Sequence, residues 1–196
     1  MADPQCYKTM RKDFGAKTWL YPMPVLIIGT YDEKGVPDAM NAAWGGIYDY
    51  NQITISLGSH VTTENIRKNK AFTVSVGTLK TLEASDFVGL VSLAKEPKKL
   101  EKAGLHAFKS NKVNAPLFEE YPFTLECELI SLDGEPGEGG TLIGQIVNVS
   151  IDESVLTEGR VDIKKLQPIA FDSVNSKYLL LNEEVADAFR VGLKLK

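Results

Sequence analysis

Strand-like segments follow one another along the first 60 residues with very short gaps between them. Residues 24–31 are rich in Val, Ile and Leu and end at the turn sequence DEKG. Residues 37–50 form a short strand candidate interrupted by Gly45 and Gly46, and residues 51–58 alternate as a strand. A doubly wound α/β fold needs helices of about ten residues between most strands, and these gaps are too short. The spacing therefore favours a β-barrel or sandwich decorated by helices.

The rest of the chain continues this pattern. Further strands are predicted at residues 71–77, 121–133 and 141–152, and the glycine-rich sequence GEPGEGG between the last two predicts a hairpin loop. Residues 61–69 predict a short helix with a Ser/Thr cap signal, and residues 79–102 predict two short helices broken at Gly89 and Pro97.

The C-terminal part contains two short extended pieces, QPIAFDS and KYLLLN, and then EEVADAFRVGLKLK, which predicts a terminal helix. No internal repeat or linker separates the chain into parts. We therefore expect one domain over residues 1–196, with a core at about residues 20–151 and a C-terminal extension at residues 152–196.

Composition excludes several functional classes. The net charge of −4 argues against nucleic-acid binding as the main function. Two histidines and two cysteines, Cys6 and Cys127, have no zinc-site spacing, and we expect both cysteines to be reduced thiols of a cytoplasmic protein. No signal peptide is visible, and no apolar run approaches the roughly 20 residues that span a bilayer. The sequence also lacks the G-x-G-x-x-G, Walker A and G-x-S-x-G motifs.

Two further groups of titratable side chains are expected to have no catalytic role. His106 is expected in a surface loop, GLHAFKS. Glu126 and Glu128 alternate on one strand, so both are expected to face solvent or a subunit interface.

The segment LGSHVTTENIRKN gathers many hydrogen-bonding side chains where a strand ends and a helix begins. Hydroxyls and free backbone N–H groups at a helix N-terminus favour an anion, and the neighbouring Arg67 and Lys68 favour it further. Lys80, after the next strand, is expected to reach the same edge. The alternative is an ordinary helix start, with Thr62 or Thr63 as the cap and Asn65 bonded back to the chain.

The segment MNAAWGGI places small residues beside a strand, where a planar group can approach the backbone closely. Trp44 alone is more typical of a core or an interface. Together with the anion site one strand later, this segment fits a flat ligand with a phosphate tail.

The order of these segments resembles the flavin reductase-like family, which includes flavoredoxins. The resemblance rests on PMPVLIIGT, the GVPD turn, NAAW, a strand and then SHVTTENI, with SDFVGLVS and YPFTLECELI further on. These segments span roughly residues 20–151. The resemblance implies a mainly β fold, an FMN-binding split β-barrel with a few short peripheral helices. It also implies a homodimer with the flavin near the subunit interface.

The resemblance further implies where FMN would lie. The isoalloxazine ring would lie against the backbone of Asn41, Ala42, Ala43 and Trp44. The phosphate and ribityl chain would lie in the crowded polar run, at Leu57, Ser59, His60, Thr62, Thr63 and Asn65, with Lys80 as an added cation. A third segment, with Asp86, Gly89 and Ser92, would approach the flavin. At His60 the sequence departs from the commonest pattern of the family.

A bound flavin supplies the redox chemistry, so no catalytic acid or base and no metal is expected. Two versions remain open: an NAD(P)H-dependent flavin reductase, and a flavoredoxin-type electron carrier with a redox protein as donor. A module that binds FMN or another phosphorylated ligand without turnover is the alternative. We expect neither a nucleic-acid nor a membrane partner.

Overall fold

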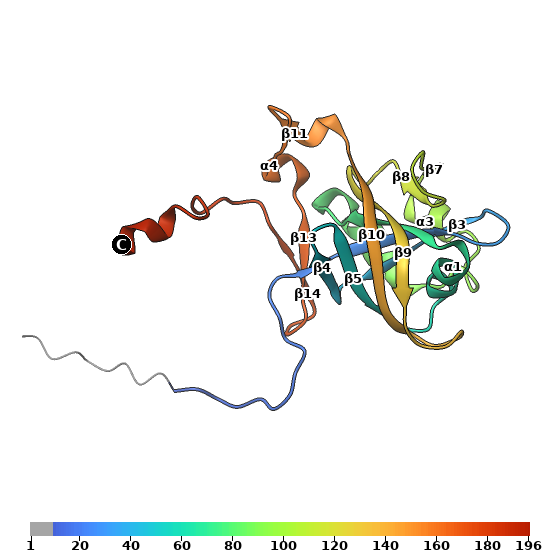
Figure 1. Cartoon of the computed structure of the whole chain (residues 1–196), viewed down its shortest axis with the longest axis horizontal. Coiled ribbons are helices and arrows are strands. Elements are labelled where there is room, and N and C mark those ends of the chain that lie inside the picture. Colours follow the sequence, from blue (N-terminus) through green and yellow to red (C-terminus); the bar gives the residue numbers. More distant parts are fainter. Residues whose placement is uncertain (1–9) are drawn as a thin grey trace, which may run out of the picture.

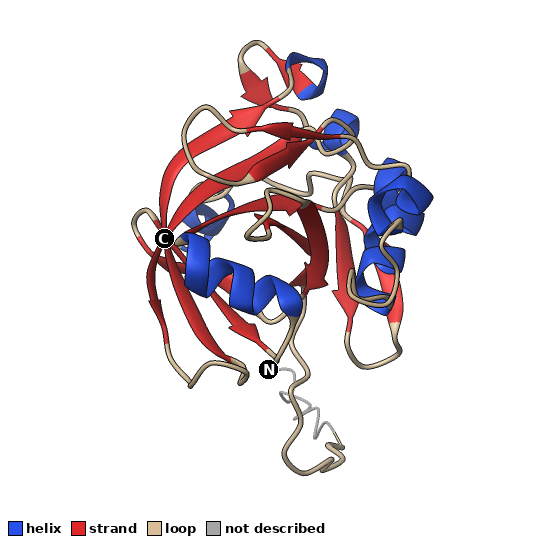
Figure 2. Cartoon of the chain, turned by 90° about the vertical axis from the view of Figure 1, so that its right-hand side faces the viewer, coloured by secondary structure: helices blue, strands red, loops and turns tan. Residues whose placement is uncertain are grey.

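The structure is a computed structural model that describes residues 10–196. Its main element is an antiparallel sheet of seven strands that curves into an open barrel (Figures 1 and 2). In spatial order the strands are β3 (Pro37–Ala42), β2 (Leu26–Tyr31), β6 (Ala71–Val76), β9 (Phe123–Leu132), β10 (Gly140–Ile151), β5 (Gln52–Leu57) and β4 (Gly45–Asp49). The fold is mainly β, as predicted, and β2, β5, β6, β9 and β10 are close to their predicted positions.

Residues 37–50 form two strands rather than the single predicted one. β3 ends at Ala42, and β4 begins at Gly45, where it pairs with Ile55 of β5. Because β3 and β4 are the two edges of the sheet, Ala43 and Trp44 cross the split of the barrel. A Cβ on Gly45 would lie 2.9 Å from the Thr54 carbonyl oxygen, so this close crossing requires glycine.

Two apolar clusters hold the sheet. One fills the barrel around Ile28, Ile55 and Phe72, which are fully buried. The other packs the outer side of β2 against the helices and the C-terminal strands, around Ile27, Val88 and Phe118. β2 is buried along nearly its whole length because it faces both clusters, which explains its continuous apolar sequence.

The helices are short, and α1 (Val61–Asn69) matches its prediction. The segment predicted as two broken helices contains α2 (Leu82–Leu90) and α3 (Lys99–Ala103), preceded by the 3₁₀ turn η1 (Leu79–Thr81). A small α4 (Ile163–Leu166) lies near the C-terminus. No helix within residues 10–196 is long and apolar enough to cross a membrane.

The C-terminal part returns to the body of the protein. β13 (Ile169–Asp172) pairs with β1 (Met23–Pro24) and with β14 (Lys177–Leu180), which confirms the two predicted extended pieces. The remaining strands are two short hairpins, β7 (Ala107–Lys109) with β8 (Pro116–Phe118), and β11 (Leu156–Thr157) with β12 (Arg160–Val161), the latter preceded by the 3₁₀ turn η2 (Glu153–Val155).

The predicted terminal helix is largely wrong. Beyond Leu181 the chain extends away from the body (Figure 1), and only the 3₁₀ turn η3 (Val191–Leu195) is helical. Its apolar side chains are exposed, Phe189 at 99%. A short helix gains most of its stability from packing an apolar face, and this segment packs on no surface within residues 10–196.

Glu126 also differs from its prediction, because it is buried rather than solvent-facing. Its carboxylate accepts hydrogen bonds from Ser110 Oγ and, at 2.5 Å, from Asn148 Nδ2. Ser110 in turn accepts from the backbone N–H groups of Lys112 and Val113, so Glu126 fixes the loop between β7 and β8. Glu128 is exposed as predicted.

A buried ion pair joins three elements beside β3. Lys99 Nζ lies 3.1 Å from Asp38 Oδ1, and each side chain is 2% exposed. Thr62 Oγ1 of α1 donates to the other carboxylate oxygen of Asp38 at 3.1 Å, and the backbone N–H of Ala39 donates to Oδ1 at 2.9 Å. The pair therefore fixes α1 and α3 against the same strand.

Replacing Lys99 by methionine removes the cation but keeps an apolar stem of similar length. The Asp38 carboxylate is then buried without its counter-ion, so we expect Lys99→Met to lower the free energy of unfolding by about 3–5 kcal/mol. Urea denaturation measures the change. Lys98→Met is the matched control, because Lys98 is exposed, and its effect should stay within about 0.5 kcal/mol. Equal effects of the two variants would contradict the role of the buried pair.

Candidate functional site

Two adjoining cavities open beside β3 and α2. Cavity A has a volume of about 390 Å³ and cavity B of about 950 Å³. Cavity A is lined by Val25, Met40, Asn41, Ala42, Ala43, Trp44, Ser56, Leu57, Gly58, His60, Asp86, Gly89, Leu90, Phe171 and Tyr178. Cavity B is lined by Asp38, Met40, Asn41, Ser59, His60, Val61, Thr62, Glu64, Asn65, Lys68, Val88, Gly89, Leu90, Val91, Ser92, Lys95, Glu96 and Lys99.

The cavities are continuous because they share five lining residues, Met40, Asn41, His60, Gly89 and Leu90. Most of the residues predicted from the sequence lie on this surface. Asn41, Ala42, Ala43, Trp44, Leu57, His60, Asp86 and Gly89 line cavity A, whereas Ser59, Thr62, Asn65 and Ser92 line cavity B. Thr63 and Lys80 line neither cavity.

Small residues bring α2 close to β3 and so form one wall. A Cβ on Gly89 would lie 3.0 Å from Asn41 Cβ, closer than side-chain carbons normally approach. One turn earlier, Asn41 Nδ2 donates to the Ser85 carbonyl oxygen at 2.9 Å. The side chain of Asn41 is therefore fixed by the helix, and the residues from Asn41 to Trp44 line cavity A.

Three aromatic rings line one side of cavity A in a row, which we call the aromatic wall. Trp44 lies 6.3 Å from Phe171, and Phe171 lies 6.2 Å from Tyr178, measured between ring centroids. Tyr178 Oη donates to Asp86 Oδ1 at 2.7 Å. Burial, together with this bond, raises the pKa of Tyr178 to about 12, so the phenol remains a donor at neutral pH.

The sequence prediction missed Phe171 and Tyr178. Both lie in the two short extended pieces that were recognised as strands, but nothing in their local pattern indicates that β13 returns to β1 beside Trp44. A long-range strand pairing was needed to find them.

The polar run at the start of α1 faces the protein more than the cavity. Thr63 Oγ1 donates to the Gly58 carbonyl oxygen at 2.8 Å, and Asn65 Nδ2 donates to Thr30 Oγ1 at 3.1 Å. The N-cap residue is His60, whose side chain makes no capping bond, so neither Thr62 nor Thr63 caps the helix. These side chains anchor α1, and the exposed groups at its start are His60 and Ser59, which donates to the Gly137 carbonyl oxygen at 2.7 Å.

The cations around cavity B differ from those expected. Arg67 points away, toward the Leu132 carbonyl oxygen at 3.3 Å, and Lys68 pairs with Glu33 at 2.7 Å. Lys80 is exposed on η1, outside both cavities. Lys95 lines cavity B from the loop after α2 and has no ion-pair partner within residues 10–196. No local sequence pattern indicates Lys95, because it sits in a loop with several other lysines.

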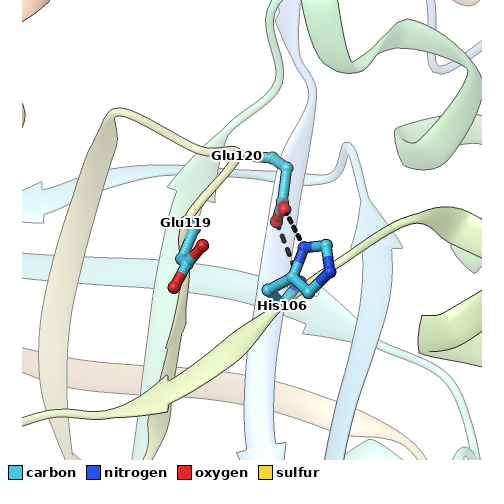
Figure 3. Close-up of side chains that lie close together, drawn as sticks. All are labelled: His106, Glu119 and Glu120. Carbon is cyan, nitrogen blue, oxygen red and sulfur yellow. Dashed lines mark hydrogen bonds and ion pairs between the residues drawn. The ribbon is translucent and has the colours of Figure 1, made fainter.

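A separate surface cluster lies at the start of β7 (Figure 3). His106 Nδ1 lies 2.6 Å from Glu120 Oε1, and the His106 backbone N–H donates to Glu120 Oε2 at 3.0 Å. Ligand atoms of His106, Glu119 and Glu120 all lie within 4.8 Å of one another. The bond to Glu120 raises the pKa of His106 above its usual value. The exposed histidine matches the predicted surface position.

Cys127 is a buried free thiol, as expected for a strand cysteine. Burial raises its pKa to about 12, which keeps the thiol protonated and unreactive at neutral pH. Cys6 lies outside the described residues.

Asn65→Ala tests whether the polar run is structural. The substitution removes the donor to Thr30 Oγ1 in a buried position, so we expect a loss of about 1–3 kcal/mol in unfolding free energy. Chemical denaturation measures this loss. Lys68→Ala, on the exposed side of the same helix, is the control and should cost clearly less, because it loses only an exposed ion pair with Glu33. A stability unchanged in Asn65→Ala would show that the bond contributes nothing.

Glu120→Gln tests the origin of the raised His106 pKa. Loss of the carboxylate should return the pKa of His106 toward 6.5, as measured by NMR titration of the ring protons. A folded-state pKa above the unfolded value means that the stabilisation is full below pH 6.5 and is lost as pH rises through the folded pKa. His106→Asn assigns the signal, since His60 is the other histidine. An unchanged pKa in Glu120→Gln would contradict the assignment of the shift to this pair.

Comparison with known proteins places this geometry in a family. The chain is similar to the flavoredoxin of Desulfovibrio vulgaris (Miyazaki F), with 34% identity, a TM-score of 0.86, and coverage of 93% of this chain and 100% of that one. A flavoredoxin from Methanosarcina acetivorans is 24% identical with a TM-score of 0.84, covering 96% of this chain and 100% of that one.

The same fold occurs in an FMN-binding domain of a flavin reductase-like enzyme from Shewanella baltica. That domain is 21% identical with a TM-score of 0.72, covering 84% of this chain and 88% of that one. The family model of the flavin reductase like domain matches residues 18–171, which include β1 to β12, all but the last residue of β13, and most of the walls of both cavities. The chain therefore belongs to the flavin reductase-like family and has the split-barrel fold of that family.

Proposed function

We propose that the protein binds FMN across cavities A and B and transfers electrons through it. The observation that carries this proposal is the continuity of the two cavities, one lined by small residues and three aromatic rings, the other lined by polar side chains and Lys95. A planar ring with a phosphorylated chain matches that pair of environments. Similarity to flavoredoxins and to an FMN-binding domain supports the same ligand.

In this proposal different residues bind different parts of FMN. The backbone from Asn41 to Trp44 would hold the ring in cavity A, with Leu57 and Gly89 on adjoining sides. The phosphate would lie in cavity B between the N-terminus of α1 and Lys95, where free N–H groups and a cation favour an anion. His60 lies on both cavities and would contact the ribityl chain between them.

When bound, FMN supplies the electron-accepting chemistry, and the protein needs no catalytic acid or base. The chain's own groups orient the ring and shape access to it. Backbone N–H groups beside Ala43 would favour negative charge on the reduced ring without titrating.

Two donors fit this function: NAD(P)H, as in a flavin reductase, and a redox protein, as for a flavoredoxin-type carrier. Similarity to a flavoredoxin at 34% identity favours the carrier. A homodimer fits the exposed side chains of Ile47 and Tyr48, which are 70% and 58% exposed on β4, the strand that follows Trp44. The buried reduced thiol of Cys127 fits a cytoplasmic location.

The visible spectrum tests FMN binding first. The protein is mixed with FMN and desalted, and a retained flavin spectrum with quenched flavin fluorescence is expected. Anaerobic addition of NADH or NADPH then separates the roles: bleaching by either nucleotide supports a reductase, and bleaching only by a reduced redox protein supports a carrier. Retained flavin that neither donor reduces would support a binding module without turnover. Failure to bind FMN in titration would contradict the proposal.

Lys95→Ala tests the phosphate position. Loss of the cation should weaken FMN binding roughly fivefold, about 1 kcal/mol, because the site is open to solvent. Riboflavin has no phosphate, so its affinity should not change. Lys80→Ala is the matched control, since that lysine lies outside both cavities. A similar loss of affinity for riboflavin would show that Lys95 acts on something other than the phosphate.

A further inference from the structure

The C-terminal hairpin of β13 and β14 provides part of the wall of cavity A. β13 contributes Phe171, and β14 contributes Tyr178, the residue of the site farthest along the chain. Tyr178 lies beyond residues 18–171, which the family model covers. The aromatic wall is therefore completed by a strand outside the matched domain.

This hairpin behaves as a unit that is weakly held on its outer side. Its turn is fixed internally, because Asp172 accepts hydrogen bonds from the backbone N–H groups of Val174 and Asn175 at 2.9 and 3.1 Å. β13 is anchored by β1, but β14 pairs with β13 alone and forms the edge of its sheet. Leu179 and Leu180 beside Tyr178 are 40% and 38% exposed, so the packing of β14 against the core comes mainly from the Tyr178 ring.

One side-chain hydrogen bond ties β14 to α2 across the cavity. Among the described residues, Tyr178 Oη to Asp86 Oδ1 is the side-chain bond that joins these two elements. It links positions 92 residues apart in the sequence. Because the phenol stays protonated well above neutral pH, the bond persists over the range in which the protein is handled.

We propose that Tyr178, held by Asp86, closes the aromatic wall over bound flavin and limits how fast FMN leaves cavity A. The inference rests on the proposed FMN binding and goes beyond it by assigning retention of the flavin to a residue pair. Without the bond β14 stays paired with β13, but the Tyr178 ring is no longer tied to α2 and can move away from cavity A. The pair thereby decides whether FMN is held as a cofactor or exchanged.

Tyr178→Phe is the decisive variant, because it keeps the aromatic ring and removes the single hydroxyl. All variants are made in a Trp19→Phe background, so that Trp44, in the aromatic wall, is the one remaining tryptophan of the two and its fluorescence can be followed. FMN dissociation is measured by stopped flow against excess of an FMN-trapping protein. We expect the dissociation rate to rise about tenfold, the effect of one hydrogen bond to a charged acceptor, with the association rate within twofold.

Tyr121→Phe is the matched control. Tyr121 Oη lies 3.0 Å from Ser85 Oγ, one residue before Asp86 on the same helix, but Tyr121 does not line cavity A. Removal of the Tyr121 hydroxyl should leave the dissociation rate of FMN unchanged. Asp86→Asn keeps an oxygen that accepts from Tyr178, so its effect should be smaller than that of Tyr178→Phe. An unchanged rate in Tyr178→Phe, or an equal rise in Tyr121→Phe, would overturn the proposal.

A measurement without flavin separates this inference from the proposed function. In the apoprotein, acrylamide quenching of Trp44 fluorescence should increase in Tyr178→Phe and stay at the parent level in Tyr121→Phe. A wild-type chain that fails to bind FMN would contradict the proposed function, while this quenching still reports whether the bond closes the wall. Equal quenching in both variants and the parent would overturn the closing role itself.

Discussion

The buried pair of Asp38 and Lys99 organises the site because it joins three elements at one point. Asp38 belongs to β3, Lys99 to α3, and Thr62, which also donates to Asp38, to α1. A buried charge tolerates little displacement of its partners, since each lost contact leaves a group without compensation. The floor of cavity B is therefore fixed by electrostatics, whereas the walls of cavity A depend on aromatic packing and on close backbone contact at Gly89.

The start of α1 shows how one short segment combines structure and surface. Threonine and asparagine side chains turn inward and attach the helix to Asp38, Gly58 and Thr30. Their inward direction leaves the backbone N–H groups of the first turn free toward cavity B. The polar composition of the segment thus reflects anchoring of the helix, and the anion-favouring property comes mainly from its backbone.

Much of the architecture was predictable because it depends on local patterns. The strands that became β2, β5, β6, β9 and β10, the hairpin loop between the last two, and α1 followed from apolar periodicity and glycine-rich turns. The positions of Asn41 to Trp44 and of Gly89 around a common cavity followed from the family resemblance. What escaped prediction depends on contacts between distant parts of the chain. Phe171 and Tyr178 reach the site through the pairing of β13 with β1, and the burial of Glu126 depends on Ser110 and Asn148. The prediction of a terminal helix is wrong for the opposite reason, since its apolar side chains pack on no surface within residues 10–196.

The order in which the chain supplies the two cavities has a consequence for synthesis. Every residue that lines cavity B lies between Asp38 and Lys99, whereas the lining of cavity A runs from Val25 to Tyr178. A nascent chain therefore emerges with all side chains that line cavity B long before it supplies the last wall of cavity A. Because contacts of such long sequence separation form late in folding, cavity A is completed only after translation has passed the final hairpin. A ligand that needs both cavities can therefore bind only after β14 has been synthesised and folded.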